Sequence, residues 1–415
     1  MGLVNSACRR ARPRRVSDDW LMETPLPKPL PRLFSRFVAP LKGASPQRNK
    51  LLQNPLTVQH SFLALSRATK AASDTLMPQK TLTSALLAIC IVYALMKYGQ
   101  KSKRTKKVSK TDERVLILGA STLDGLGAEF LRQYLERGAR QIVIVGRRKQ
   151  ALDHVRHTML KQTEGRGKRH PHAQVYVVPT ELTETEGVIK LRDFVIQNLY
   201  GLDTLHIVFG VTSILPILGV ANVDPCNVNA SGQATAFLHA SREGLDQIAQ
   251  TVQHSSDGNL KGTAIVLGAM LPILQTTSAN PAVITIGSVA GLVPAPTRAV
   301  YCASKSSQHF LIRSVELECE AQAGTPVPGS DKRRARVNFL LVAPGPIKNS
   351  FVATYAVDAT TGPRDNRERA LEVPDVVRGT LRRVDAEQWG ILVIPTHAFV
   401  GSLLAQFNAT YVPVL

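Results

Sequence analysis

The stretch ITIGSVAGLVPAPTRAVYCASK, residues 284–305, places three polar side chains at set distances from one another. Tyr301 and Lys305 stand four residues apart, which is one turn of a helix, so the phenol and the amine would share a face. Ser288 precedes the tyrosine by thirteen residues and follows the apolar run AVITIG, which predicts a buried strand. A tyrosine and a lysine at this spacing also occur by chance, so the surrounding sequence decides whether the three form a site.

The chain around this stretch alternates apolar strands with helical segments. RVLILGA and QIVIVG predict two strands, and the amphipathic run GLGAEFLRQYLERGA predicts a helix between them. Further apolar runs predict more strands: AQVYVVP, LDTLHIVFG, AVITIG and RVNFLLVAPG. Such alternation indicates a parallel sheet with helices on both faces. The sequence therefore predicts an α/β fold with a Rossmann-type, doubly wound parallel sheet in a single catalytic domain.

Glycines gather where the first predicted strand meets the first predicted helix. The segment GASTLDGLG contains Gly119, Gly125 and Gly127. Glycines at this junction permit a tight turn and close backbone approach, and the helix N-terminus can hold a pyrophosphate. A glycine cluster inside a β-α-β unit indicates a dinucleotide site.

With both segments described, the chain from about residue 114 to 400 resembles the short-chain dehydrogenase/reductase family. The catalytic set of that family is Asn, Ser, Tyr and Lys, and the last three match Ser288, Tyr301 and Lys305 at the family spacing. The resemblance implies an enzyme that interconverts a carbonyl and an alcohol with a nicotinamide cofactor.

Two asparagines fit the family's Asn-x-x-Gly pattern, in NASG (Asn229) and in NLKG (Asn259). Asn259 lies 29 residues before Ser288, close to the family spacing, whereas Asn229 lies 59 before it. We therefore expect Asn259 to be the catalytic asparagine, and the resemblance implies that it keeps a water chain for proton supply.

The roles of the other three residues follow from acid–base chemistry. A free phenol has a pKa of about 10, and a nearby ammonium favours its ionised form. Tyr301 can then exchange a proton with a substrate oxygen that Ser288 orients. By resemblance, Lys305 would also hold the nicotinamide ribose.

The resemblance further implies a cofactor site along one edge of the sheet. It takes in the glycine loop, the start of the next helix, the end of the second strand, the helix that carries Lys305, and the Pro-Gly that follows the sixth strand. The expected cofactor-binding residues are Gly119, Ser121, Gly125, Leu126, Gly127, Arg147, Arg148, Tyr301, Lys305, Pro344, Gly345 and Ile347.

Arginines stand where an NAD-selective fold places a carboxylate. That acid lies about 20 residues beyond the glycine loop. Here the residue twenty positions after Gly127 is Arg147, and no Asp or Glu occurs between Arg147 and Asp153. Arg147 and Arg148 suit a 2′-phosphate, so we expect NADP(H) rather than NAD(H). The alternative is that both arginines cap a strand at the surface.

Three departures from the family pattern occur. Five residues instead of three separate Gly119 from Gly125, IVFG (207–210) replaces Asn-Asn-Ala-Gly, and Asn349 or Ser350 stands for a threonine. The first two motivate an alternative function, a non-enzymatic membrane-anchored scaffold with a degenerate dinucleotide-binding fold. The intact serine, tyrosine and lysine argue against that alternative.

Charge and cysteine content exclude other function classes. The net charge of +20 lies mostly in the first part of the chain, because residues 1–80 carry 14 Lys/Arg against 4 Asp/Glu, and residues 115–415 carry 29 against 25. A nucleic-acid binder should show a basic face on its folded domain, so we expect no nucleic-acid partner. The five scattered cysteines form no metal-binding or disulfide pattern, and we expect no metal.

The first 113 residues predict a leader, an anchor and a linker. Residues 1–80 are basic, proline-rich and without periodicity, which is typical of disorder or targeting. TLTSALLAICIVYALM (81–96) is uncharged and followed by a dense basic run, which favours a membrane helix at 81–97 over a buried core helix. We expect a basic linker at 98–113 and the catalytic domain at 114–415.

Basic residues are denser after the apolar segment than before it, which places the catalytic domain in the cytosol. We expect a single-pass protein of the endoplasmic reticulum that acts on a lipophilic substrate of sterol, fatty-acyl or sphingoid type. Mitochondrial or plastid targeting by the Arg-rich leader is the alternative, followed by N-terminal acylation at MGLVNSAC. For the oligomeric state, the sequence is compatible with a homodimer and with a monomer.

Overall fold

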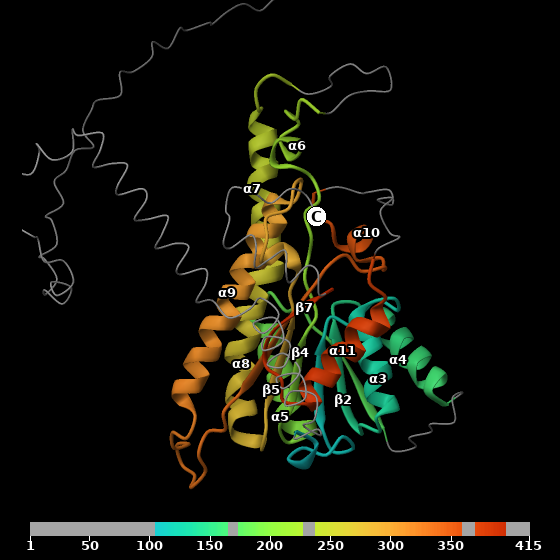
Figure 1. Cartoon of the computed structure of the whole chain (residues 1–415), viewed down its shortest axis with the longest axis vertical. Helices are drawn as coiled ribbons and strands as arrows, with labels where there is room; N and C mark the ends of the chain where they lie inside the picture. Colours follow the sequence, from blue (N-terminus) through green and yellow to red (C-terminus); the bar gives the residue numbers. More distant parts are fainter. Residues whose placement is uncertain (1–103, 165–172, 227–236, 359–369, 396–415) are drawn as a thin grey trace, which may run out of the picture. The chain divides into compact units, whose positions relative to one another are not determined.

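In the described part of the chain, seven parallel strands form one sheet in the order β3-β2-β1-β4-β5-β6-β7 (Figure 1). The computed structural model describes residues 104–164, 173–226, 237–358 and 370–395, which belong to the compact unit Ile91–Leu415. The strand order reverses at β1, with β2 and β3 on one side and β4 to β7 on the other. In such sheets ligands bind outside the carboxyl ends of the strands at the reversal. The predicted α/β fold with a doubly wound parallel sheet is confirmed.

The strands are β1 (Arg114–Leu118), β2 (Gln141–Gly146), β3 (Gln174–Pro179), β4 (Thr204–Ile207), β5 (Ala282–Ile286), β6 (Asn338–Pro344) and β7 (Gly390–Ile394). The longer helices are α3 (Leu126–Glu136), α4 (Lys149–Glu164), α5 (Thr185–Leu199), α7 (Arg242–Ser256), α8 (Gly262–Thr277), α9 (Ala299–Gln322) and α11 (Val373–Asp385). Short turns of helix are η2 (Arg104–Lys106), α6 (Ile217–Val220), η3 (Asp257–Lys261), η4 (Val289–Gly291) and α10 (Phe351–Tyr355).

Alternate residues of each strand face two separate apolar layers. Val115 and Ile117 of β1 belong to the layer that contains α3, α4 and α11. Leu116 and Leu118 belong to the layer that contains α5, α8 and α9. Because both faces of the sheet are covered, the central strands are apolar throughout rather than alternating with polar residues.

The folded body includes Arg104, ten residues before the predicted start of the domain. This side chain is buried, and its Nη1 donates to Glu113 Oε1 at 2.6 Å. Nη2 donates to Thr204 Oγ1 at 2.7 Å and to the carbonyl oxygen of Asn280 at 3.3 Å. A buried charge is tolerated when it is paired and hydrogen-bonded. Part of the predicted basic linker is therefore bound at the amino-terminal edge of the sheet.

Among the described residues, one helix is long and apolar enough to cross a membrane by length and composition. It is the continuous helix Arg242–Thr277, which comprises α7, η3 and α8, and 44% of its most apolar window is buried inside the protein. Val266, Leu267 and Met270 of this helix pack in the core, which accounts for its apolar character. The predicted leader and the predicted membrane helix at 81–97 lie outside the described residues.

Candidate active site

Ser288 and Tyr301 meet at the carboxyl end of β5. Ser288 is the N-cap of the short turn η4, and its Oγ accepts a hydrogen bond from the amide of Ala290 at 3.1 Å. Tyr301 lies in the first turn of α9 with 7% of its surface exposed, and the Ser288 side chain is close enough to its phenol to lower the pKa of that group. The structure thus brings these two hydroxyls together.

Lys305 follows one turn further along α9 and is 3% exposed. Its Nζ donates to the carbonyl oxygen of Ile286 at 3.2 Å and to Gln308 Oε1 at 2.9 Å. Burial lowers the pKa of Lys305 from 10.5 to about 7, because an apolar environment disfavours the charged amine. The amine is therefore balanced between its two protonation states near neutral pH.

Asn259 lies on the π-helical turn η3, where α7 passes into α8. Its fully buried side chain exchanges two hydrogen bonds of 3.0 Å with the backbone of Val211, through Oδ1 and Nδ2. Nδ2 also donates to Ser304 Oγ at 2.9 Å. The π turn widens the helix where this side chain points toward the end of β4, a use often found at functional sites. The other candidate, Asn229, lies outside the described residues.

Gly210 is the position around which Asn259 and Lys305 approach each other. A Cβ atom at Gly210 would lie 2.7 Å from Asn259 Oδ1 and 3.3 Å from Lys305 Nζ. Only glycine fits there without moving the asparagine. The residue before it, Phe209, packs its backbone nitrogen 2.5 Å from the place of a Cβ at Gly119. The segment IVFG therefore keeps close backbone packing although it departs from the family pattern.

Arg298 is a residue of this site that the sequence analysis missed. Its Cζ lies 4.7 Å from the centroid of the Tyr301 ring, and its Nη2 donates to Thr212 Oγ1 at 2.8 Å. Burial raises the pKa of Tyr301, while the hydrogen bond from Ser288 and the charge of Arg298 act in the opposite direction. Among the causes of the Tyr301 pKa, the charge effect that was expected from Lys305 comes from Arg298, which stands three residues before the tyrosine.

His309 is a second residue of the site that was not predicted from the sequence, and it holds the backbone of Ser288 in place. Its Nε2 accepts a hydrogen bond from the Ser288 amide at 3.3 Å. The ring fills a slot between Gly287 and Gly291, where added Cβ atoms would lie 2.1 and 2.4 Å from ring atoms. Burial, with a smaller effect of the Lys305 charge, lowers the pKa of His309 to about 4. The ring is thus neutral at pH 7 and can accept.

The glycine loop forms a cradle at the N-terminus of α3. Gly119 has φ +96°, a left-handed conformation that favours glycine, and a Cβ at Gly127 would lie 2.3 Å from the Gly119 carbonyl oxygen. Gly125 is the N-cap of α3, and Leu126 begins the helix. Exposed backbone amides at a helix N-terminus attract phosphate. These residues fit the pyrophosphate of a dinucleotide.

The lengthened glycine loop is tied to the segment that follows β6. Asp124 accepts hydrogen bonds from the Ser350 backbone amide at 2.6 Å and from Ser350 Oγ at 2.8 Å. Thr122 Oγ1 lies 3.1 Å from the hydroxyl of Tyr355 in α10. The longer spacing between Gly119 and Gly125 therefore supplies side chains that reach across the carboxyl edge of the sheet.

A hollow of about 410 Å³ lies beside this loop, between it and the start of α4. Arg148 lines the hollow, whereas Arg147 is exposed and places Nη1 3.8 Å from Glu181 Oε2. The other lining residues are Ser121, Thr122, Leu123, Asp124, Ala151, His154, Val155 and Thr354. Of the two arginines predicted to bind cofactor, the structure places Arg148 at the hollow.

Pro344, Gly345 and Ile347 lie at the same carboxyl edge. Pro344 ends β6, and the Gly345 amide donates to the carbonyl oxygen of Ile394 at 2.7 Å. Ile347 pairs with Leu371 through an isolated bridge. The expected cofactor residues thus lie at or after the carboxyl ends of β1, β2 and β6, and on α9, which follows β5.

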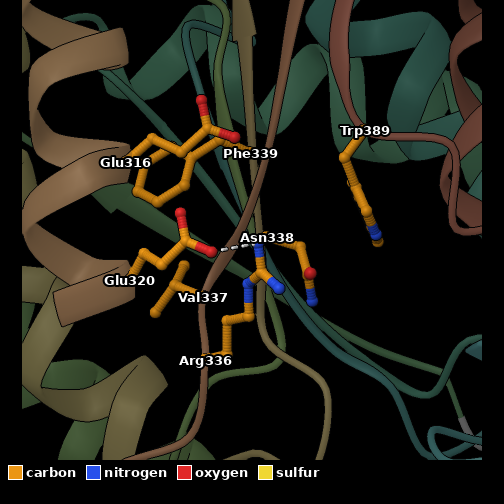
Figure 2. Close-up of a pocket in the computed structure, with 7 residues that line it drawn as sticks. All are labelled: Glu316, Glu320, Arg336, Val337, Asn338, Phe339 and Trp389. Carbon is orange, nitrogen blue, oxygen red and sulfur yellow. Dashed lines mark ion pairs between the residues drawn. The ribbon is translucent and has the colours of Figure 1, made fainter. Parts of the chain in front are cut away.

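A second hollow, of about 110 Å³, lies far from these residues (Figure 2). Glu316 and Glu320 of α9 line it, and Glu320 pairs with Arg336 at 2.8 Å. Glu316 stands fifteen residues after Tyr301 on one helix, a rise of about 22 Å. This hollow therefore belongs to the opposite end of α9 and not to the site.

Metal-ligand clusters of three or more His, Cys, Asp or Glu do not occur among the residues that the structure describes. Within the same residues, Cys226, Cys302 and Cys319 are free thiols.

Comparison with known proteins identifies the family. A family model described as short chain dehydrogenase matches residues 113–356, more than half of the chain. An uncharacterized oxidoreductase of Staphylococcus aureus is 24% identical over 271 residues, which cover 65% of this chain and 90% of the relative. Another, of Staphylococcus epidermidis, is 27% identical over 221 residues, or 53% of this chain and 77% of the relative.

A solved short chain dehydrogenase/reductase from Burkholderia phymatum, in complex with NAD, has the same fold. It is 16% identical with a TM-score of 0.53, and the match covers 74% of this chain and 99% of that one. The chain belongs to the short chain dehydrogenase family. It is an oxidoreductase of the NAD(P)-dependent dehydrogenase/reductase type.

The buried amine predicts a pH-dependent stability. Because its pKa falls from 10.5 to about 7 on folding, the unfolded chain binds more protons between these values. Lys305 therefore adds up to about 1.4 kcal/mol of stability for each pH unit of rise through this window. The apolar variant Lys305→Met lacks this dependence, so its stability relative to wild type should be most favourable at pH 7 and decline toward pH 10.

Urea unfolding at several pH values measures the difference. The exposed Lys348, changed to Met, serves as the control and should show a nearly constant difference from wild type. A constant difference for Lys305→Met as well would contradict a buried amine with a lowered pKa.

Proposed function

We propose that this protein is a membrane-anchored, NADP(H)-dependent oxidoreductase that interconverts a carbonyl and an alcohol on a lipophilic substrate. The observation that carries the reaction type is the approach of the Ser288 side chain to the phenol of Tyr301, with Arg298 over the phenol ring. Hydroxyls that meet beside a cation at the open edge of a sheet are suited to proton exchange with a substrate oxygen.

Ser288 and Tyr301 act on the substrate oxygen. In the reducing direction, Tyr301 donates its phenolic proton to the carbonyl oxygen while Ser288 holds that oxygen by a hydrogen bond. The bound nicotinamide dinucleotide supplies the hydride. Arg298 stabilises the phenolate that remains on Tyr301, since a cation over the ring face interacts favourably with the ring and its negative oxygen. In the oxidising direction the phenolate takes the proton of the alcohol.

Lys305 on α9 and Asn259 on η3 support the reacting groups and do not act on the substrate oxygen themselves. The amine of Lys305, close to its pKa at neutral pH, serves as a proton store beside the tyrosine and as a donor to the cofactor ribose. Asn259 fixes the backbone of Val211 and the hydroxyl of Ser304, which places α9 against the end of β4. The scaffold alternative is not favoured, because a scaffold has no need of buried polar groups arranged around a phenol.

The hollow beside the glycine loop supports a preference for NADP(H). Arg148 and His154 line it together with the hydroxyls of Ser121 and Thr122. Guanidinium and hydroxyl groups are good partners for a ribose 2′-phosphate.

Exposed apolar side chains support a lipophilic substrate. Ile217 and Leu218 of α6 and the neighbouring Phe237 and Leu238 are exposed. The amide of Phe237 donates to the carbonyl oxygen of Asn222 at 3.1 Å, which links them near the start of α7. Because α6 follows β4 in the chain, it lies beyond the carboxyl end of that strand (Figure 1). The exposed side chains on it are therefore on the side of the sheet that carries the site. A lipophilic molecule could enter from a membrane at this side.

A homodimer is proposed from a second set of exposed apolar residues. Phe310 and Leu317 on α9, and Leu245 and Val252 on α7, stand seven residues apart on their helices and are exposed. Residues at this spacing share a helix face, and α7 and α9 lie side by side (Figure 1). Such a surface suits pairing with a second copy.

Changing Tyr301 to Phe should abolish turnover, because only the transferable proton is lost. Affinity for NADPH should stay within a few-fold. Turnover of an aromatic quinone with NADPH, together with NADPH binding by fluorescence, separates the two effects. The matched control is Tyr200→Phe, at an exposed tyrosine. Full activity in Tyr301→Phe would refute the catalytic assignment.

Changing Arg148 to Ala should weaken NADPH binding by about ten- to a hundredfold, the value of a hydrogen bond to a charged partner. NADH binding should hardly change. Arg147→Ala tests the other arginine. Arg156→Ala is a control on α4, the helix that begins directly after Arg148, since Arg156 pairs with Asp153 at 3.1 Å. A wild-type protein that binds NADH more tightly than NADPH would overturn the cofactor preference.

Deleting residues 1–98 should release from membranes a protein that still reduces a soluble carbonyl, because the folded body that contains Arg104 is retained. Sedimentation after a carbonate wash measures the release. If the shortened chain stays with the membranes, another segment anchors it and the proposed role of residues 81–97 is insufficient.

A further inference from the structure

Gln308 is a buried polar residue that the proposed mechanism leaves without a role. It stands three residues after Lys305 on α9 and is fully buried. Its Oε1 accepts from Lys305 Nζ at 2.9 Å, and its Nε2 donates to Thr263 Oγ1 at 3.0 Å. Because a protonated amine can only donate, the carbonyl end of the amide must face Lys305. The orientation of Gln308 is therefore determined by its neighbours.

Thr263 carries the connection onward to the π turn. Its hydroxyl accepts from Gln308 and donates to the backbone carbonyl oxygen of Asn259 at 2.8 Å. The donors all point the same way along the path, from Lys305 to Gln308, from Gln308 to Thr263 and from Thr263 to the Asn259 carbonyl. Lys305, Gln308, Thr263 and Asn259 thus form a continuous hydrogen-bonded path from α9 to η3, in which every member is buried. Fully satisfied buried networks fix the geometry of the groups that they join.

The few groups around Lys305 determine how well its charged form is stabilised. Burial is the cause of the lowered pKa of this amine. The groups that face it are the Ile286 carbonyl from β5, Asn259 from η3, the backbone of Gly210 after β4, and Gln308 and His309 from α9. Tyr301 precedes it by one turn on the same helix. His309 is neutral at pH 7, and the phenol of Tyr301 is protonated in the resting state. The protonated amine of Lys305 is therefore stabilised by hydrogen bonds to neutral acceptors and not by a nearby negative charge.

We propose that Gln308 is a positioning residue of this site: its carbonyl fixes the amine of Lys305, and its amide group joins that amine to the turn that carries Asn259. This inference rests on the function proposed above, because Lys305 is the residue that is positioned. Gln308 contributes no reacting atom. Its effect is to keep the amine protonated, and in place, at the pH where Tyr301 has to recover its proton.

Two variants of similar size separate positioning from packing. Gln308→Leu removes the acceptor, so the amine of Lys305 should lose its proton at lower pH. Gln308→Glu keeps an oxygen in the same place and adds negative charge, so the amine should hold its proton to higher pH. A residue needed only for packing would not shift the titration of Lys305 in opposite directions.

The direct measurement is competitive acetylation of the full chain with acetic anhydride across a pH series, read for Lys305 by mass spectrometry. Because only the neutral amine reacts, and the pKa of Lys305 is about 7 in the wild type, labelling of Lys305 at pH 6 should rise several-fold in Gln308→Leu. Labelling at pH 7 should fall several-fold in Gln308→Glu, as expected for a hydrogen bond to a charged group. The exposed Lys348 is the internal reference. Unchanged Lys305 labelling in both variants would overturn the proposal.

The second measurement is the pH profile of reduction of an aromatic quinone with NADPH. The part of the profile that depends on Lys305 should shift to lower pH in Gln308→Leu and to higher pH in Gln308→Glu. Thr263→Ser, which keeps the hydroxyl, should stay closer to the wild-type profile than Thr263→Val. Equal losses at every pH in all variants would indicate a packing role and overturn the proposal. If wild type reduces no carbonyl while the labelling of Lys305 still shifts, the proposed function fails and the positioning role of Gln308 stands.

Discussion

The site depends on one constraint, which is that a lysine amine is kept out of water at the carboxyl end of β5. An amine in this place needs acceptors, and Ile286 and Gln308 supply them. Space for it exists because Gly210 has no side chain. The π turn at Asn259 completes the same arrangement, since it brings an asparagine to Val211 and a backbone carbonyl within reach of Thr263. Glycine, π turn and amide network are thus consequences of burying Lys305.

The carboxyl edge of the sheet gathers the remaining parts because parallel strands end on the same side. The reversal of strand order at β1 leaves a gap between the helices that follow β1 and β4. Gly119 and Gly127 close the turn between β1 and α3 so tightly that neither tolerates a Cβ. Helix N-termini, hydroxyls and the buried amine then face one edge, while the opposite edge is held by the ion pair of Arg104 and Glu113.

Features that depend on neighbouring residues were open to prediction from the sequence, and features that depend on tertiary partners were not. The strands could be found because burial on both faces makes each of them a continuous apolar run, as in RVLIL. Ser288, Tyr301 and Lys305 sit on one strand, turn and helix, so their spacing carries their geometry. Gln308 and Thr263 lie 45 residues apart, and Arg104 and Asn280 lie 176 apart. No local pattern distinguishes such partners from surface polar residues, and the sequence DGNLK has no feature that marks a π turn.

The lengthened glycine loop has a consequence for how long a ligand stays. Asp124 engages both the amide and the hydroxyl of Ser350, and Thr122 meets Tyr355, so the loop after β1 and the segment after β6 are linked. In many well-evolved enzymes the opening of a loop and the release of product, rather than chemistry, limit turnover. We expect a molecule held between these two segments to leave when the link opens. The longer loop would then affect the residence time of a ligand and leave the residues that transfer protons unchanged.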